Sequence, residues 1–246
     1  MRQIMAIGNV TPDSFFAGAR LLSPSYSEVD EEAVVKWGRR AISEGASILD
    51  IGGCSTRPGS KPVEEQEEWR RVEGALTALR REIPDAQLSL DTFRPGIAAR
   101  ALEQFGQMII NDISGGCEAM TEVVKAFHAP YIWTLRGQLD APEKQPHMRD
   151  LDLILDPGFG FIGSVDADYA CLRKMNRLQA YGLPVLVGVS RKSMIYKPLG
   201  LTPETCLSAT QIVQFYALQQ GATILRTHDV AATAQTIKLF NETQCI

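Results

Sequence analysis

The chain has 246 residues, of which 45% are hydrophobic and 22% charged, a composition ordinary for a globular protein with one sizeable core. The net charge of −4 argues against a nucleic-acid-binding surface, and no apolar run approaches the length of a membrane span. The five cysteines are scattered without CxxC spacing, and the first residues turn polar too early for a signal peptide. We therefore expect a reduced cytoplasmic protein that forms one domain over residues 1–246 and has no thiolate zinc site.

Short runs rich in β-branched residues alternate with helical patterns along the whole chain. The eight runs are Ile4–Val10, Ser47–Gly53, Gln87–Thr92, Met108–Ser114, Pro130–Arg136, Leu151–Pro157, Pro184–Ser190 and Ala222–Asp229. Strict alternation of strand and helix indicates parallel pairing through right-handed crossovers. Eight such units predict an α/β fold of the (β/α)8 TIM-barrel type, for which about 250 residues is typical. A doubly wound sheet is the alternative that the pattern leaves open.

Apolar stripes and proline positions predict the helices. Apolar residues recur every three or four positions from Trp69 to Ile83 and again from Met120 to Phe127. Pro95 and Pro203 each stand where a helix would start, because the missing N–H is no loss in a first turn. Asp229 follows the last strand and is placed to cap the last helix.

The connection Gln138–Asp150 is unsuited to a packed helix. It contains Pro142 and Pro146 and has almost no apolar stripe, and a proline inside a helix costs about 3 kcal/mol. We expect the fifth barrel helix to be missing or shortened and this segment to lie across the flank of strands five and six. Apolar surface left there would be covered by the loop itself, by a neighbouring helix or by another subunit.

Cationic side chains stand at the carboxyl ends of several predicted strands, where parallel α/β proteins bind their ligands. The seventh run passes directly into Ser190–Ser193, which reads Ser-Arg-Lys-Ser. Arg57, Arg226 and His228 follow the second and eighth runs. They suit a multiply charged anion, because arginine makes bidentate contacts to phosphate.

A second group at the same ends consists of hydrogen-bond acceptors and an amide. Asp91, Asn111 and Asp156 could hold a planar heterocycle that carries an amino group beside a ring N–H. An anion beside such a ring predicts a pterin- or purine-like phosphate ester as ligand. Asp50, Asp91 or Asp156 taken singly could instead cap a loop or pair with Lys192, so the prediction depends on the residues occurring together.

Eight segments at the strand ends match one known family. They are Asn9–Phe15, Asp50–Gly53, Ser55–Gly59, Asp91–Thr92, Ile110–Gly116, Leu155–Phe161, Ser190–Ser193 and Arg226–Asp229. Together they resemble dihydropteroate synthase, a pterin-binding TIM-barrel family, over essentially the whole chain. Neither chance nor another kind of pterin-binding barrel would be expected to reproduce all of them.

The resemblance implies a transferase of folate biosynthesis and a sulfonamide target. Members of this family condense 6-hydroxymethyl-7,8-dihydropterin diphosphate with p-aminobenzoate, which gives 7,8-dihydropteroate and diphosphate. It also implies a homodimer without nucleic-acid or membrane partners, and a Mg²⁺ cofactor held by Asn9.

The resemblance also assigns the substrate contacts. The residues expected to bind the pterin ring are Asp91, Asn111, Asp156 and Lys192. Those expected to meet the diphosphate are Thr56, Arg57, Arg226 and His228. Ser193, at the start of a helix, is expected to receive the carboxylate of p-aminobenzoate. The catalytic contributions are expected from Arg57, Asp91, Lys192 and Arg226.

The chain departs from the family pattern at several places. Cys54 stands where glutamate is usual, Trp133–Gly137 replaces Met-His-Met-Arg-Gly, and Ile162–Ser164 replaces a Gly-Lys pair. These differences and the short fifth crossover favour a second hypothesis, a pterin-binding relative with weak or no activity that acts with a partner. A third hypothesis, a pterin-binding methyltransferase barrel, shares the acceptors but has no use for the Arg226–His228 motif.

Overall fold

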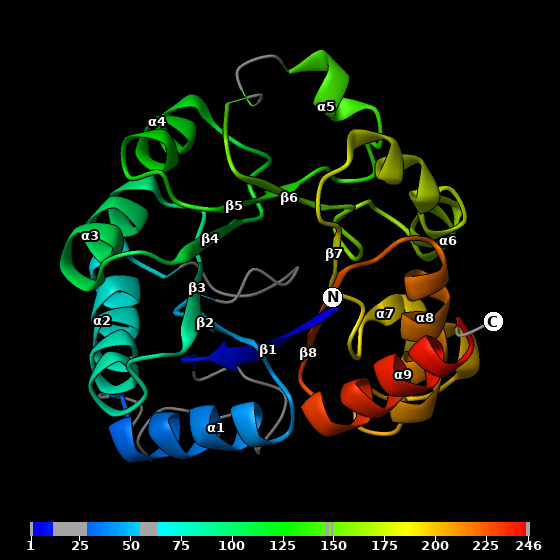
Figure 1. Ribbon diagram of the computed structural model, residues 1–246, viewed down its shortest axis with the longest axis horizontal. Helices are drawn as coiled ribbons and strands as arrows, with labels where there is room; N and C mark the ends of the chain where they lie inside the picture. The colour runs from blue at the N-terminus through cyan, green and yellow to red at the C-terminus, as the bar shows by residue number, and fades with distance from the viewer. Residues whose placement is uncertain (1, 12–28, 55–62, 146–147, 149, 245–246) are drawn as a thin grey trace.

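The computed structural model describes residues 2–11, 29–54, 63–145, 148 and 150–244. Within them, eight parallel strands form one sheet that curls into a nearly closed barrel (Figure 1). The strands are β1 (Gln3–Asn9), β2 (Ile48–Gly52), β3 (Gln87–Asp91), β4 (Ile109–Asp112), β5 (Tyr131–Thr134), β6 (Leu153–Asp156), β7 (Leu186–Val187) and β8 (Ile224–Thr227). Their order is β6-β5-β4-β3-β2-β1-β8-β7, and a single bridge between Leu155 and Val185 joins β6 to β7. The predicted TIM barrel is confirmed, and the doubly wound sheet is excluded.

Helices surround the barrel, as Figure 1 shows. The longer ones are α1 (Glu31–Ser43), α2 (Glu65–Glu82), α3 (Pro95–Phe105), α4 (Glu118–Ala126), α6 (Val165–Leu172), α8 (Leu207–Gln219) and α9 (Val230–Glu242). The short ones are α5 (Ala141–Lys144), α7 (Ser193–Tyr196) and the 3₁₀ turns η3 (Met175–Tyr181) and η4 (Lys197–Leu199). Among the described residues, none of these helices is long and apolar enough to cross a membrane.

The barrel interior is filled by one apolar layer, to which every strand except β3 contributes one side chain. The layer consists of Met5, Ile48, Ile109, Ile132, Ile154, Leu186 and Ile224. On β3 the residue in register with Ile109 is Ser89. Alternate residues of the strands point outward and pack against the helices, as the alternation of strand side chains requires.

Both predicted apolar stripes lie on helices and Pro95 starts one, whereas Pro203 does not; the stripe from Met120 lies on α4. The stripe from Trp69 lies on α2, and Pro95 opens α3. Pro203 does not open a helix, because α8 begins four residues later at Leu207. Around Pro203 the backbone N–H of Thr202 donates to Thr205 Oγ1 over 3.1 Å, and this side-chain hydrogen bond closes a turn instead.

The seventh strand is shorter than predicted. The run Pro184–Ser190 contributes only Leu186 and Val187 to the ladder with β8. The Lys192 N–H donates to the Val189 carbonyl over 3.1 Å, so the chain is already turning after Val187. The residues of this run are hydrophobic because they are buried in the barrel wall, and only two of them belong to the strand.

The fifth crossover is reduced to one helical turn, α5, as the two prolines predicted. The flank that this exposes is covered by the connection itself. Met148 is buried, and its methyl group occupies the place that a Cβ on Gly116 would need, close to Tyr131 and Trp133.

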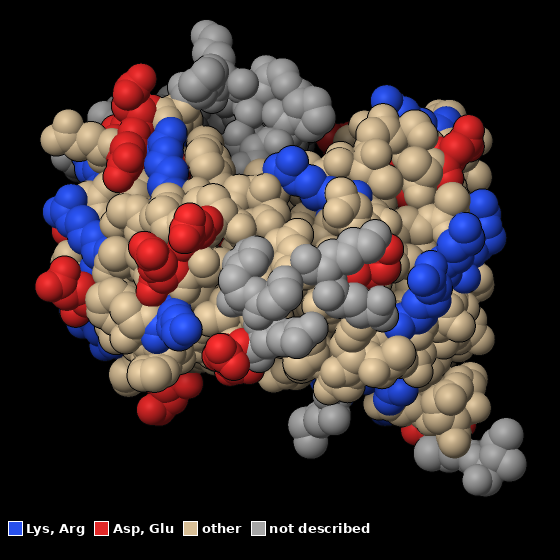
Figure 2. Space-filling view, turned by 90° about the horizontal axis from the view of Figure 1, so that it is seen from above, with Lys and Arg blue, Asp and Glu red and all other residues tan. Residues whose placement is uncertain are grey.

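On the face shown in Figure 2, acidic and basic side chains both occur among uncharged ones.

Candidate functional site

A set of polar side chains lies just beyond the apolar layer, toward the carboxyl ends of the strands. Residues two apart on a strand share a face. Two positions after the apolar residues of β2, β4, β5, β6 and β8 stand Asp50, Asn111, Thr134, Asp156 and Arg226. This carboxyl end is the rim at which parallel barrels bind their ligands.

Arg226 lies between two carboxylates. Its Nε donates to Asp50 Oδ2 and its Nη2 to Asp91 Oδ2, each over 2.6 Å. Burial alone would lower the pKa of the guanidinium, but the two carboxylates raise it above its ordinary value. The sequence placed Arg226 with the anion and Asp91 with the ring, whereas the structure joins the two groups in one ion-paired cluster.

Asp91 retains capacity to bind a ligand. Its Oδ1 is buried and accepts no hydrogen bond from the described residues. Burial raises the pKa of Asp91 to about 7, assisted by the Asp50 carboxylate and opposed by Arg226. A buried acceptor without a partner costs free energy, and a ligand N–H placed there would remove that cost.

Lys192, in the loop after β7, lies close enough to Asp156, the last residue of β6, for their charges to interact. The Lys192 ammonium donates to the Phe159 carbonyl and lies 5.0 Å from the centroid of the Phe161 ring. Burial lowers the pKa of Lys192 to about 8, although Asp156 opposes the shift. Burial also raises the pKa of Asp156, whose Oδ1 accepts from the Gly158 N–H over 2.8 Å. Both groups are therefore partly buried polar groups that a polar ligand can reach.

An ion pair holds the loops after β7 and β8 together. Arg191 donates through Nε and Nη2 to the two carboxylate oxygens of Asp229, each over 2.8 Å. Asp229 occupies the cap position of α9, but its side chain makes no capping hydrogen bond because Arg191 occupies it. The backbone N–H of His228 donates to Ser190 Oγ over 3.2 Å. This clamp fixes His228 beside the loop that carries Lys192.

The remaining predicted residues fall in three places. Thr56 and Arg57 lie outside the described residues. Ser193 is the first residue of α7, as the sequence predicted for a helix start. Asn9 ends β1, in register with Gly52 of β2.

Asn9 can bind Mg²⁺ only if other ligands come from outside the described side chains. Its amide oxygen is a hard donor of the kind that Mg²⁺ accepts. In the part of the chain that the structure describes, no group of three or more His, Cys, Asp or Glu side chains could hold a metal ion. The donor set therefore suits a cation that takes its other ligands from a phosphate ester and water.

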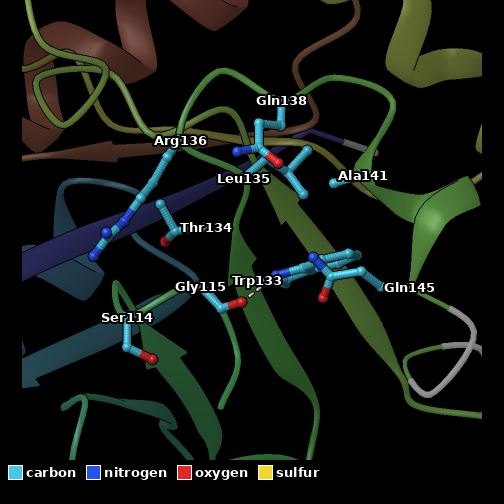
Figure 3. Close-up of a pocket in the computed structure, with 9 residues that line it drawn as sticks. All are labelled: Ser114, Gly115, Trp133, Thr134, Leu135, Arg136, Gln138, Ala141 and Gln145. Carbon is cyan, nitrogen blue, oxygen red and sulfur yellow. Dashed lines mark hydrogen bonds between the residues drawn. The ribbon is translucent and has the colours of Figure 1, made fainter.

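A pocket of about 190 Å³ lies at the carboxyl end of β5, beside α5 (Figure 3). Trp133 Nε1 donates to the Gly115 carbonyl over 3.0 Å within it, and Arg136 bridges to the Ile113 carbonyl over 2.9 Å. Its other lining residues include Gln138 and Gln145. Thr134, one of the polar side chains at the carboxyl ends of the strands, also lines this pocket, so the pocket adjoins the strand-end cluster.

The structure adds residues to which the sequence assigned no role. The sequence offers Asp50 only as part of a matching segment and as a carboxylate that could cap a loop or pair with Lys192, yet Asp50 lies at the centre of the cluster. Ser89 Oγ donates to Asp50 Oδ1 over 2.6 Å. A signal was available, because Asp50 interrupts the otherwise apolar strand Ile-Leu-Asp-Ile, where an unpaired charge would be costly.

Comparison with known proteins gives one consistent family. The model of the pterin binding enzyme family matches residues 5–151 and 143–228. The chain is 34% identical to the dihydropteroate synthase of Haemophilus influenzae, over 98% of this chain and 94% of that protein.

Solved structures agree with this result. The dihydropteroate synthase of Yersinia pestis in a sulfonamide complex superimposes with a TM-score of 0.88 at 30% identity, over 100% of this chain and 95% of that one. The Xanthomonas albilineans enzyme with 4-aminobenzoic acid gives a TM-score of 0.84 at 33% identity, over 100% and 94% of the two chains.

Proposed function

The chain belongs to the pterin-binding enzyme family and is homologous to dihydropteroate synthases over nearly its full length, and from this premise we propose that it is itself a dihydropteroate synthase. It would join 6-hydroxymethyl-7,8-dihydropterin diphosphate to p-aminobenzoate and release diphosphate, in folate biosynthesis.

One observation carries the proposal, namely the buried strand-end acceptors beside a fixed guanidinium. Asp91 offers an oxygen that no described residue uses, and Asp156 lies near Lys192. A reduced pterin presents an amino group next to a ring N–H, which matches carboxylate acceptors. The Arg226 guanidinium keeps unused N–H donors for the diphosphate.

The same residues account for the chemistry. When diphosphate departs, positive charge develops on the pterin methylene and spreads into the ring. Asp91 and Asp156 would stabilise this charge, and Arg226 and His228 would stabilise the charge on the leaving diphosphate. The aniline nitrogen of p-aminobenzoate is already a nucleophile near neutral pH, so it requires positioning more than activation.

The remaining roles follow from the family. Ser193 at the start of α7 would receive the carboxylate of p-aminobenzoate, and Thr56 and Arg57 would join the diphosphate site. Asn9 would hold Mg²⁺ together with the diphosphate, and the cation would supply charge neutralisation of the leaving group.

A second candidate function rests on Cys54. Glutamate is usual at this position, and burial together with the nearby Glu68 raises the pKa of the Cys54 thiol. The side chain is therefore neutral at pH 7, so a negative charge beside Asp91 is lost. This favours a pterin-binding relative with weak activity, which acts with a partner, as the alternative to an efficient enzyme.

A coupled assay of diphosphate release tests both functions. Purified protein with pterin diphosphate, p-aminobenzoate and Mg²⁺ should release diphosphate only when both substrates are present. Asp156→Asn should slow turnover by about 100-fold, because charge-assisted hydrogen bonds to the ring are lost. Asp152→Asn, an exposed change just before the opposite end of β6, is the matched control and should have no effect.

The outcomes separate the two candidates. Near-normal turnover in Asp156→Asn, with unchanged thermal unfolding, would remove Asp156 from the site. Absent turnover with intact pterin binding would favour the weakly active relative, and a large gain in Cys54→Glu would identify Cys54 as the cause.

A further inference from the structure

Asp50 is the most enclosed charge of the cluster. Its side chain is 0% exposed, compared with 11% for Asp91 and 19% for Arg226. No substrate can therefore touch it without a rearrangement of the barrel interior. Any effect of Asp50 on the reaction has to pass through the residues that it contacts.

Those contacts come from three different strands. Asp50 Oδ1 accepts from Ser89 Oγ of β3 over 2.6 Å. Asp50 Oδ2 accepts from Asn111 Nδ2 of β4 over 3.2 Å and from Arg226 Nε of β8 over 2.6 Å. The single Oδ2 atom thus joins a residue expected at the pterin ring to one expected at the diphosphate.

The contact with Asn111 decides which end of its amide is available. A side-chain amide has a donating NH₂ and an accepting carbonyl oxygen. Because Asp50 takes an N–H of Asn111, the amide nitrogen is directed at Asp50 and the opposite end, Oδ1, remains as an acceptor. An acceptor at this position suits the N–H groups of a pterin ring.

The contact with Arg226 fixes a second group. With Nε on Asp50 and Nη2 on Asp91, the guanidinium is held at two points and cannot rotate. The same arrangement occupies Asp91 Oδ2 and leaves Asp91 Oδ1 as the unused acceptor. Asp50 therefore orients Asn111 directly, Arg226 directly and Asp91 through Arg226.

We propose that Asp50 is a positioning residue, which sets the donor and acceptor pattern of the pterin and diphosphate sites without touching either substrate. This inference rests on the proposed function. A carboxylate suits the role because one oxygen accepts from both Arg226 and Asn111 while the other is held by Ser89. An enclosed charge is a poor source of stability compared with an apolar side chain, which is consistent with a role in the site.

Three variants test the proposal. Asp50→Ala removes both acceptors and frees Asn111 and Arg226. Asp50→Asn keeps the shape, since its amide oxygen can face Arg226 and Asn111 while its NH₂ faces Ser89, but it removes the charge. Ser89→Ala is the matched control, because it loses a hydrogen bond to the same carboxylate on the side away from the site.

Three measurements are made on each variant, of which steady-state kinetics gives the KM for p-aminobenzoate. Isothermal titration gives the affinity for 6-hydroxymethylpterin and, separately, for inorganic diphosphate with Mg²⁺. ¹⁵N NMR of the unliganded protein follows the Arg226 Nε–H, whose exchange with solvent is slow while a buried carboxylate accepts it.

We expect graded effects. Asp50→Ala should weaken pterin binding by about 30-fold or more, because a charge-assisted arrangement is lost. Asp50→Asn should weaken it by about 3- to 10-fold, and Ser89→Ala by less than about 3-fold. The KM for p-aminobenzoate should stay unchanged in all three, and the Arg226 Nε–H should exchange faster in both Asp50 variants but not in Ser89→Ala.

Several results would overturn the proposal. It falls if Asp50→Ala binds pterin as well as the natural protein does, or if the Arg226 Nε–H exchanges equally slowly in Asp50→Asn. It falls equally if Ser89→Ala loses as much affinity as the Asp50 variants. If Asp50→Ala does not fold, Asp50→Asn decides alone. If the natural protein binds no pterin while Arg226 responds to Asp50 as expected, the proposed function fails and the positioning of Arg226 stands.

Discussion

At the scale of single residues, the candidate site contains ionisable groups whose charged forms are disfavoured because the fold shields them from water. Burial raises the pKa of Asp91 to about 7 and lowers that of Lys192 to about 8. Each shift marks a charged form that the unliganded protein disfavours. A substrate that supplies complementary groups reduces this desolvation cost. Shifted pKa values of this kind are typical of a site that binds a polar ligand.

Lys192→Met should make the protein more stable and inactive. The folded pKa of about 8 lies below the ordinary 10.5, so the unfolded state binds this proton more tightly. The contribution of Lys192 to stability is thus present above about pH 10.5 and is lost as the pH falls through 8. At pH 7 we expect a gain of about 1–2 kcal/mol in Lys192→Met, kept modest because the side chain is only partly buried.

Denaturant unfolding at pH 7 and at pH 10.5 measures this effect. The gain should shrink at the higher pH, where the lysine is neutral in the folded state and half deprotonated in the unfolded state. Lys197→Met, an exposed change in η4, serves as the control and should leave stability unchanged. A loss of stability in Lys192→Met at pH 7 would contradict the expectation.

The polar side chains at the carboxyl rim were largely recognisable in the sequence, but the hydrogen bonds that join them were not. Asp91, Asn111, Asp156, Lys192 and Arg226 all lie near the carboxyl rim as their positions after apolar runs predicted. The sequence could not place Arg226 on Asp91, because that contact joins residues 135 positions apart and depends on barrel closure. The central place of Asp50 could not be predicted for the same reason, because its three partners come from three strands.

At the scale of elements, alternation predicted every strand, and the boundaries were decided by local hydrogen bonds. The run ending at Ser190 leaves the ladder early because a turn forms at Val189. The proline at 203 fails to open a helix because a threonine side chain closes a turn there. Such side-chain hydrogen bonds compete with helix and strand, and neither apolar periodicity nor proline position reveals them.

The fifth crossover shows how one side chain substitutes for a helix. The expectation of a shortened helix is confirmed by α5, and the loop itself supplies the cover. Met148→Ala should lower the free energy of unfolding by about 2–4 kcal/mol, because a buried side chain is lost from the flank of β5. Gln138→Ala, an exposed change in the same connection, is the control. Chemical denaturation measures both, and a change below about 0.5 kcal/mol in Met148→Ala would show that other groups cover the flank.

At the scale of the whole molecule, α8 exposes large apolar side chains on its surface. Its buried residues include Gln214, Ala217 and Leu218, and α8 packs against α9. Ile212 and Tyr216, one turn apart, remain exposed, with Ile212 at 71%. Among the described residues, α8 therefore has one apolar face packed against the barrel and α9 and a second apolar face that nothing covers.

These exposed side chains suit the homodimer expected from the family, which is built on helices from the later half of the barrel. We expect the protein to sediment as a dimer of 27.1 kDa chains and Ile212→Glu to shift it toward monomer, because a charge at a desolvated contact is costly. Ile42→Glu on α1, also an exposed isoleucine, is the matched control and should remain dimeric. Sedimentation velocity over a range of concentrations measures the change. An Ile212→Glu protein that stays dimeric would place the interface elsewhere, and a monomeric natural protein would contradict the homodimer itself.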